Sequence, residues 1–240
     1  LNRWGSRLAP LSNWLANSWP NRWLLERFAG IDRRRPLPSF AEQTFADWFH
    51  NHQIEGDGSK DEVVLFHDTF NNYNTPSVAV AATLFLEGAG YRVVLAEKKC
   101  CGRPMISKGM LKEAREHAAW NVEKLSPYAE RGMAVVGLEP SCLLTLRDEY
   151  PDLLRSEGAK LVARQSFLLE EFLQSERDAG KLSLSFKSNG KKALLHGHCH
   201  QKALVGTAPT AAVLRWAGLE VTEVDSGCCG MAGSFGFEKE

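Results

Sequence analysis

The sequence predicts an α/β protein with two Rossmann-like repeats and parallel sheets, preceded by a helical amino-terminal segment. Short apolar runs typical of strands alternate with segments of helical periodicity beyond residue 61. Two Cys-Cys-Gly triplets, at 100–102 and 228–230, each follow a predicted strand. The residues before the triplets also match, because 89–93 aligns without a gap on 217–221. An internal repeat of this kind indicates a duplication.

The chain divides into three predicted segments: 1–60, 61–190 and 191–240. The first is a helical linker or docking segment, in which Pro20 separates two helices. Tryptophan and leucine recur there at helical spacing among arginines: Trp4, Leu8, Leu11, Leu15, Trp23, Leu24. Such a stripe suits either a neighbouring domain or a membrane surface, and we expect docking on another domain. The second and third segments are the two repeats, the last of them truncated.

Within the repeats, strands and helices are expected to alternate. A helix begins after Pro76 and ends at Gly88, while another, over 108–130, contains Pro127. Strands are expected at 63–66, 92–96, 133–138, 160–163, 192–196 and 220–224, and further helices at 167–173 and 209–216 and from 139 onward. A loop spans about 175–190. Since ligands bind at the carboxyl ends of parallel strands, the cysteines that follow these strands should gather at one edge.

The six cysteines are better explained as metal ligands than as a disulfide framework: Cys100, Cys101, Cys142, Cys199, Cys228 and Cys229. A disulfide between sequence neighbours is strained. Ordinary buried cysteines are common, but they do not explain two identical triplets. Zinc sites usually separate paired thiolates by two or more residues, whereas adjacent thiolates can serve different irons of one iron–sulfur cluster. The glycine after each pair allows the backbone to approach a bulky cofactor.

Further residues surround these thiols. Cys142 lies near a helix amino terminus, where the dipole and free amide groups favour a thiolate. His196, His198 and His200 surround Cys199, and alternation on a strand would place them on one face. They are either ligands, hydrogen-bond donors to ligands, or structural residues.

Composition excludes some classes of function. The hydrophobic fraction is 44% and the formal net charge is zero, so nucleic-acid binding has no electrostatic support. No run approaches the roughly 18 apolar residues of a membrane span. The chain starts with Leu1 and has no signal-peptide pattern. We expect a part of a longer protein, cytoplasmic or peripheral at the inner face of the membrane.

These motifs together resemble the cysteine-rich CCG domain family over roughly residues 62–240. The family includes the heterodisulfide reductase B subunit, lactate-utilisation proteins, and iron–sulfur subunits of glycolate oxidase and anaerobic glycerol-3-phosphate dehydrogenase. The strongest likeness is to the carboxyl-terminal part of fused FAD-linked oxidase/iron–sulfur oxidoreductases. The motifs that carry it are Asp68-Thr69-Phe70, Cys100-Cys101-Gly102-Arg103-Pro104, Glu139-Pro140-Ser141-Cys142, His198-Cys199-His200 and Cys228-Cys229-Gly230-Met231-Ala232-Gly233.

The chain departs from the family pattern in its first half. The lone cysteine that precedes the pair is absent, and its place falls at Asp68 or Thr69. Because a carboxylate can ligate iron, Asp68 is a candidate substitute, although it could instead cap a turn. Thr145 stands where a second cysteine would follow Cys142, and the last cysteine of the second half would lie beyond Glu240.

The resemblance implies an oxidoreductase, in which this chain is the electron-transfer portion of a flavin-dependent 2-hydroxy acid dehydrogenase. The substrate would be glycolate, D-lactate or D-2-hydroxyglutarate. Clusters, most simply of the 4Fe–4S type, would be held by the six cysteines, with FAD elsewhere in the full protein. Partners would be FAD-linked oxidase and ferredoxin-like domains and an acceptor such as a quinone. Thiol/disulfide chemistry at a cluster and a zinc-stabilised interaction module are the alternatives.

Overall fold

The computed structural model describes residues 2–54, 60–182, 184–186, 190–227, 230 and 235–239. The chain forms two compact units. Unit 1 comprises residues 1–53, 69–81 and 228–240, and unit 2 comprises residues 54–68 and 82–227. The helix α6 (Pro76–Gly88) contributes residues to both units.

Unit 2 is built on a parallel sheet of four strands: β1 (Glu62–Phe66), β2 (Arg92–Val94), β3 (Val135–Gly137) and β4 (Ser166–Leu168). Their spatial order is β2-β1-β3-β4. The register pairs Val64 of β1 with Val94 on one side and with Val135 on the other. The chain therefore passes from β1 to β2 on one side and then crosses to the opposite side of β1 to form β3. In parallel sheets such a reversal is the position where ligands bind, beyond the carboxyl ends of the strands.

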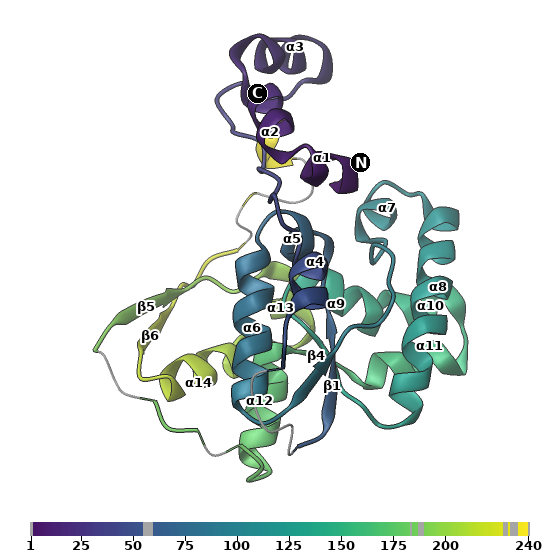
Figure 1. Ribbon diagram of the computed structural model, residues 1–240, viewed down its shortest axis with the longest axis vertical. Helices are drawn as coiled ribbons and strands as arrows, with labels where there is room; N and C mark the ends of the chain where they lie inside the picture. The colour runs from purple at the N-terminus through teal and green to yellow at the C-terminus, as the bar shows by residue number, and fades with distance from the viewer. Residues whose placement is uncertain are drawn as a thin grey trace. The chain divides into compact units, whose positions relative to one another are not determined.

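Helices cover this sheet: α7 (Arg103–Ser107), α8 (Leu111–Glu130), α9 (Pro140–Arg147), α10 (Glu149–Leu154), α11 (Glu157–Arg164) and α12 (Leu169–Asp178). Figure 1 shows α8, α10 and α11 together on one side of the sheet. The long helix α8 buries one stripe, with Ala118, Val122 and Leu125 packed against the strand residues Val64 and Val135. This 3.6-residue periodicity is the reason that the segment is helical and amphipathic.

A second, two-stranded parallel sheet in unit 2 joins β5 (Lys192–Leu195) and β6 (Glu220–Glu223). The helices α13 (Cys199–Leu204) and α14 (Ala208–Trp216) lie between these strands in the chain. The order strand, short helix, longer helix, strand is also that of the segment from β1 to β2, where α5 (Thr69–Tyr73) precedes α6. This shared order agrees with the duplication that the triplets indicate.

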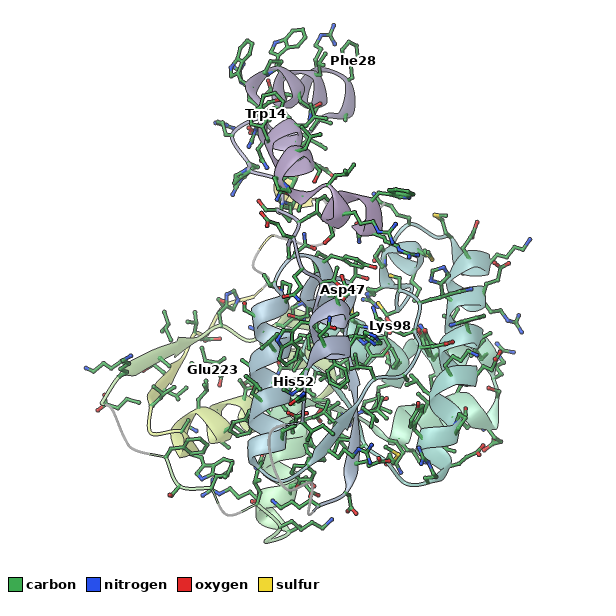
Figure 2. The ribbon with its side chains drawn as sticks, in the orientation of Figure 1. Trp14, Phe28, Asp47, His52, Lys98 and Glu223 are labelled. Atoms are coloured by element: carbon green, nitrogen blue, oxygen red, sulfur yellow. The ribbon has the colours of Figure 1, made fainter. Side chains whose placement is uncertain are left out.

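Unit 1 contains the amino-terminal helices α1 (Asn2–Arg7), α2 (Ala9–Asn17), α3 (Trp19–Ala29) and α4 (Phe45–Asn51), together with α5 and a 3₁₀ turn, η1 (Phe235–Phe237). The Asn13 amide group holds Phe40 by two backbone hydrogen bonds of 2.8 Å. Large apolar side chains remain exposed, among them Trp14 and Phe28, which Figure 2 labels. In the described part of the chain, no helix combines the length and the apolar character needed to cross a bilayer.

The parallel α/β architecture is confirmed, but two complete Rossmann-like repeats are not, since the second sheet has two strands within the described residues. The strand predicted at 160–163 is wrong, because these residues belong to α11. Ser156 caps that helix by accepting a hydrogen bond from the Ala159 amide, and Ala159, Val162 and Ala163 are buried at helical spacing. The three-residue apolar run at 161–163 does not distinguish a strand from a buried helix. The helix predicted from 167 begins at Leu169, after β4.

Candidate metal centre

Three cysteines of unit 2 come together at the carboxyl ends of the strands. Cys100 and Cys101 lie in the segment after β2, and Cys142 lies in the first turn of α9, directly after β3. The Cys101 thiol is hydrogen-bonded to the thiols of both Cys100 and Cys142. Cys101 and Cys142 are buried, and Cys100 is partly exposed. The structure thus places the Cys101 thiol between two further soft donors, Cys100 and Cys142, beside the reversal point of the sheet.

The thiols of Cys101 and Cys142 favour the protonated form in the absence of a metal. The hydrogen bond from Cys100 lowers the pKa of Cys101. The hydrogen bond with Cys142 and burial raise this pKa by more, so it lies well above the ordinary value of a thiol. The Cys142 pKa is also raised: the hydrogen bond with Cys101 lowers it, while burial and the charges of Glu139 and Asp68 raise it. Binding of a metal at this site must therefore release protons.

Cys142 lies in the first turn of α9, as expected, but its backbone amide is already engaged by Glu139. Glu139 is the N-cap residue of α9, and its carboxylate accepts a hydrogen bond of 2.6 Å from the Cys142 amide. The carboxylate therefore occupies the amide group that a thiolate would use, and its charge raises the pKa of the thiol.

Asp68 lies at the same edge, two residues beyond the end of β1, and is buried at 2% exposure. Its charge acts on both Cys142 and Lys98. The structure thus brings the carboxylate to the side of the thiols, where the resemblance puts the absent cysteine. The pKa of Lys98 lies below its ordinary value because burial lowers it, although the negative groups around it, Asp68 first, act in the opposite direction.

A buried hydrogen-bond network fixes the backbone of the first cysteine pair. The Tyr150 hydroxyl group donates to the Cys101 carbonyl at 2.9 Å and accepts from the Asn121 amide nitrogen at 2.8 Å. The Asn121 side chain also donates to the Cys100 carbonyl at 3.3 Å and accepts from the Lys99 amide at 2.7 Å. Asn121 and Tyr150 are both fully buried. This network holds the two thiols in place without using them.

Sequence reasoning missed these supporting residues: Lys98, Asn121 and Tyr150. For Asn121 there was a signal, because it occupies the apolar face of α8 between Ala118 and Leu125. A polar residue on a buried face needs a partner. Lys98 precedes Cys100 by two residues, but nothing in the sequence distinguishes it from Lys99, and no spacing relates Tyr150 to the thiols.

The second predicted half is less completely described. Cys199 is exposed at the first position of α13, and Cys228 and Cys229 lie outside the described residues. The histidines around Cys199 do not alternate on a strand, because β5 ends at Leu195. His198 is the N-cap residue of α13.

Hydrogen bonds show what His198 does. Its Nδ1 atom accepts a hydrogen bond from the His200 amide at 3.2 Å, and its Nε2 atom lies 3.1 Å from Ser141 Oγ. A neutral ring that accepts at Nδ1 carries its proton on Nε2, which donates to the serine. This contact joins the start of α13 to the first turn of α9, which bears Cys142.

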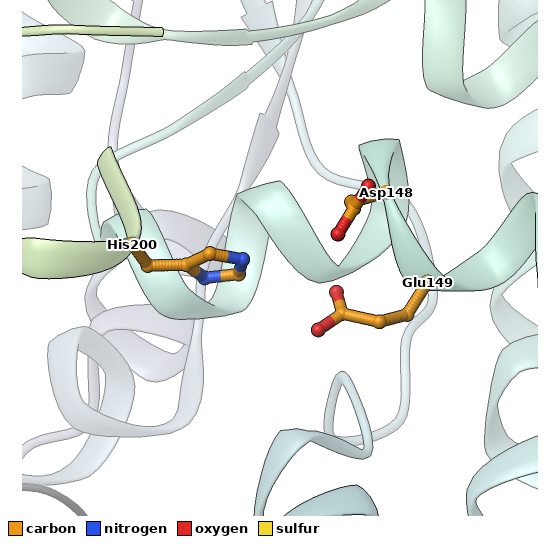
Figure 3. A group of neighbouring side chains, drawn as sticks. All are labelled: Asp148, Glu149 and His200. Atoms are coloured by element: carbon orange, nitrogen blue, oxygen red, sulfur yellow. The ribbon is translucent and has the colours of Figure 1, made fainter. Parts of the chain in front are cut away.

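A separate group of metal-ligand type contains Asp148, Glu149 and His200. Their ligand atoms lie within 4.8 Å of one another, and Figure 3 shows the two carboxylates and the imidazole ring facing a common space. Arg103 forms an ion pair with Glu149, and its charge, after burial, lowers the pKa of His200. Because a guanidinium group already neutralises one carboxylate, this group resembles an anchor between α10 and α13 more than a cation site.

Comparison with known proteins identifies the family and several relatives of this chain. The sequence model of the cysteine-rich domain CCG matches residues 64–147. The chain is 36% identical over 235 residues to the anaerobic glycerol-3-phosphate dehydrogenase C subunit of Escherichia coli strain K12. This alignment covers 97% of this chain and 59% of that protein. It is 29% identical over 178 residues to the D-2-hydroxyglutarate dehydrogenase of the same strain, covering 73% of this chain and 17% of that protein.

A third relative is lactate utilization protein A of Anoxybacillus flavithermus, 30% identical over 169 residues, covering 66% of this chain and 68% of that protein. No solved structure matches. The chain belongs to the cysteine-rich CCG domain family. It spans about three fifths of the length of its glycerol-3-phosphate dehydrogenase relative.

Proposed function

We propose that this chain binds an iron–sulfur cluster and transfers electrons from a flavin-linked dehydrogenase component to a further acceptor. The observation that carries the proposal is the contact of the Cys101 thiol with those of Cys100 and Cys142 beside the β1–β3 reversal. Thiolates are the donors that iron–sulfur clusters prefer. The three relatives are named as dehydrogenases or as a lactate utilization protein, which supports an oxidoreductase.

The residues around the thiols support this role in different ways. Cys100, Cys101 and Cys142 would hold the cluster, and Asp68 would complete the ligand set in the first half. Such a cluster would supply the acceptance and donation of single electrons. Asn121 and Tyr150 keep the ligand backbone in one geometry, so that little reorganisation accompanies a change in charge.

We propose that the flavin component oxidises a 2-hydroxy acid. The names of two relatives, which contain D-2-hydroxyglutarate and lactate, support it. Glycerol 3-phosphate is the competing substrate, supported by the name of a relative that aligns with nearly the whole chain. All three compounds carry a secondary alcohol whose oxidation releases two electrons, which a flavin can pass on one at a time.

Anaerobic reconstitution of the full chain with iron and sulfide tests the proposal. We expect a coloured protein with acid-labile sulfide, in which Cys101→Ser removes iron from the first site. A colourless protein with stoichiometric zinc would instead support a zinc-stabilised module. Cleavage of a disulfide substrate by the reconstituted protein would support thiol/disulfide chemistry.

The two predicted sites should not be equivalent. The second half, with Cys199, Cys228, Cys229 and a further cysteine of the full protein, should bind a cluster more tightly than the first half. Iron counts for Cys101→Ser and Cys229→Ser measure the difference, and equal losses would contradict it. Asp68→Ala should lower the iron content of the first site and Asp68→Cys should restore it, whereas a mere turn cap at Asp68 would leave the iron content unchanged in both.

We also propose that unit 1 docks on the flavin component through its exposed aromatic side chains. Trp4, Trp14 and Phe28 are 67%, 69% and 79% exposed, and such patches usually mark interfaces. Tryptophan fluorescence of the complex should shift to the blue when the component is added. A shift with anionic vesicles alone would favour a membrane surface, because arginines flank these side chains.

A further inference from the structure

A lysine side chain in the segment between β2 and α7 lies against the core cluster that contains Cys101 and Cys142. Lys98, labelled in Figure 2, is partly buried, and its Nζ atom lies 5.8 Å from the ring centroid of Phe66. Phe66 packs in the same core cluster as Cys101 and Cys142. Lysine is seldom buried unless it is paired. The position of Lys98 therefore requires a partner of opposite charge.

The groups that act on Lys98 are negative or become negative when a metal binds. They are Asp68 and the thiols of Cys100, Cys101 and Cys142. When the three thiols lose their protons to an iron–sulfur centre, their three negative charges exceed the positive charge of the iron–sulfur core. A net negative charge would then lie next to a buried carboxylate. Uncompensated charge in such a place is costly, because protein atoms screen it far less than water does. A fixed cation close to the site offsets part of this cost.

The neighbouring lysine points elsewhere. Lys99 is exposed, and its Nζ atom lies 4.3 Å from the ring centroid of Trp120. Its backbone amide, in turn, is held by Asn121. Two consecutive lysines thus lie in different surroundings. Lys98 lies over Phe66, in the core cluster that contains Cys101 and Cys142, and Lys99 lies over the indole ring of Trp120 on α8.

We propose that Lys98 is the charge-compensating residue of the thiolate site and raises the reduction potential of the cluster bound there. The inference rests on the proposed function. Reduction brings one electron into the site, and no bond forms or breaks. The ammonium group interacts more strongly with the reduced centre than with the oxidised one, because the reduced centre carries one more negative charge. Lys98 thereby makes the site a better acceptor for electrons from a flavin.

The size of the effect follows from Coulomb interaction across a few ångströms in a partly screened environment. Removing one unit charge at this range should change the reduction equilibrium constant on the order of tenfold. For a one-electron couple this is about 59 mV.

Redox titration of the reconstituted full chain, followed by electron paramagnetic resonance and visible absorption, tests the inference. Lys98→Gln should keep the iron and sulfide content of the wild type and shift the midpoint potential about 59 mV lower. Lys98→Arg, which keeps the charge, should stay near the wild type. Lys99→Gln is the matched control and should leave the potential unchanged.

The outcomes separate the two proposals. A wild-type chain that binds no cluster refutes the proposed function, and the role of Lys98 falls with it. A fully loaded Lys98→Gln variant with the wild-type potential refutes the role of Lys98 alone, as does an equal shift in Lys99→Gln. If Lys98→Gln fails to load, recovery of loading in Lys98→Arg supports a role of charge, and failure of both variants overturns it.

Discussion

The Tyr150 hydroxyl group connects α10 to the backbone of the first cysteine pair, and its removal should destabilise unit 2 measurably. In Tyr150→Phe the Cys101 carbonyl loses its 2.9 Å donor, and the Asn121 amide loses its 2.8 Å acceptor. Tyr150 and Asn121 are fully buried, so water does not replace these partners readily. Each buried polar group left without a partner costs about 1–3 kcal/mol. Asn121 keeps its bond to the Cys100 carbonyl, so we expect a total loss of about 2–3 kcal/mol.

Equilibrium unfolding of the reduced, metal-free full chain in urea, followed by circular dichroism, measures this loss. The midpoint should fall while the slope stays constant, because the area exposed on unfolding does not change. Tyr128→Phe is the matched control, since Tyr128 packs against the same core and its hydroxyl group has no hydrogen bond to any described residue. A loss below about 0.5 kcal/mol for Tyr150→Phe, or an equal loss in both variants, would refute the reasoning.

A double-mutant cycle locates the coupling. Asn121→Ala removes the second member of the network, and the combined variant should lose less stability than the sum of the two single variants. Residues in direct hydrogen-bond contact typically show interaction energies of about 0.5–3 kcal/mol. Additive losses would mean that Tyr150 and Asn121 act independently.

Three further predictions concern the strand end, the cysteine loop and unit 1. Gly137→Ala would place its Cβ atom 2.6 Å from Leu143 Cδ1, so urea unfolding should show a loss of about 1–3 kcal/mol, partly relieved when Leu143→Ala is added. Gly102 has φ +89°, so Gly102→Ala should cost about 1–2 kcal/mol in the same assay, and an unchanged midpoint would contradict this. Hydrogen bonds from Arg34 lower the pKa of Asp32 to about 2, so this carboxylate contributes stability above pH 3.8 that is lost as the pH falls through about 2. In an NMR titration, Arg34→Gln should move the Asp32 midpoint up toward its ordinary value, and an unchanged midpoint would show another cause.

Local patterns predicted much of the fold because they act over a few residues. Pro76 and Gly88 delimit α6 as expected, since proline suits the first turn of a helix and glycine suits its end. The strands β1, β2 and β3 lie close to their predicted ranges. The prediction for residues 160–168 was wrong because a helix with three buried residues is followed almost directly by a three-residue strand. The apolar runs in this region are too short to distinguish the 3.6-residue period of a helix from the two-residue period of a strand.

The donors of the candidate site can be predicted from the sequence, because two repeated Cys-Cys-Gly triplets indicate thiolate ligands whatever surrounds them. The sequence also predicts which edge the donors occupy, since Cys100, Cys101 and Cys142 follow predicted strands of a parallel sheet. The tertiary structure alone decided what charges these thiols meet. Lys98, Asp68 and Glu139 reach the thiols from three different loops, and Tyr150 and Asn121 reach the cysteine backbone from two helices. Interactions of this kind depend on the order in which β1, β2 and β3 pack, and sequence separation does not encode that order.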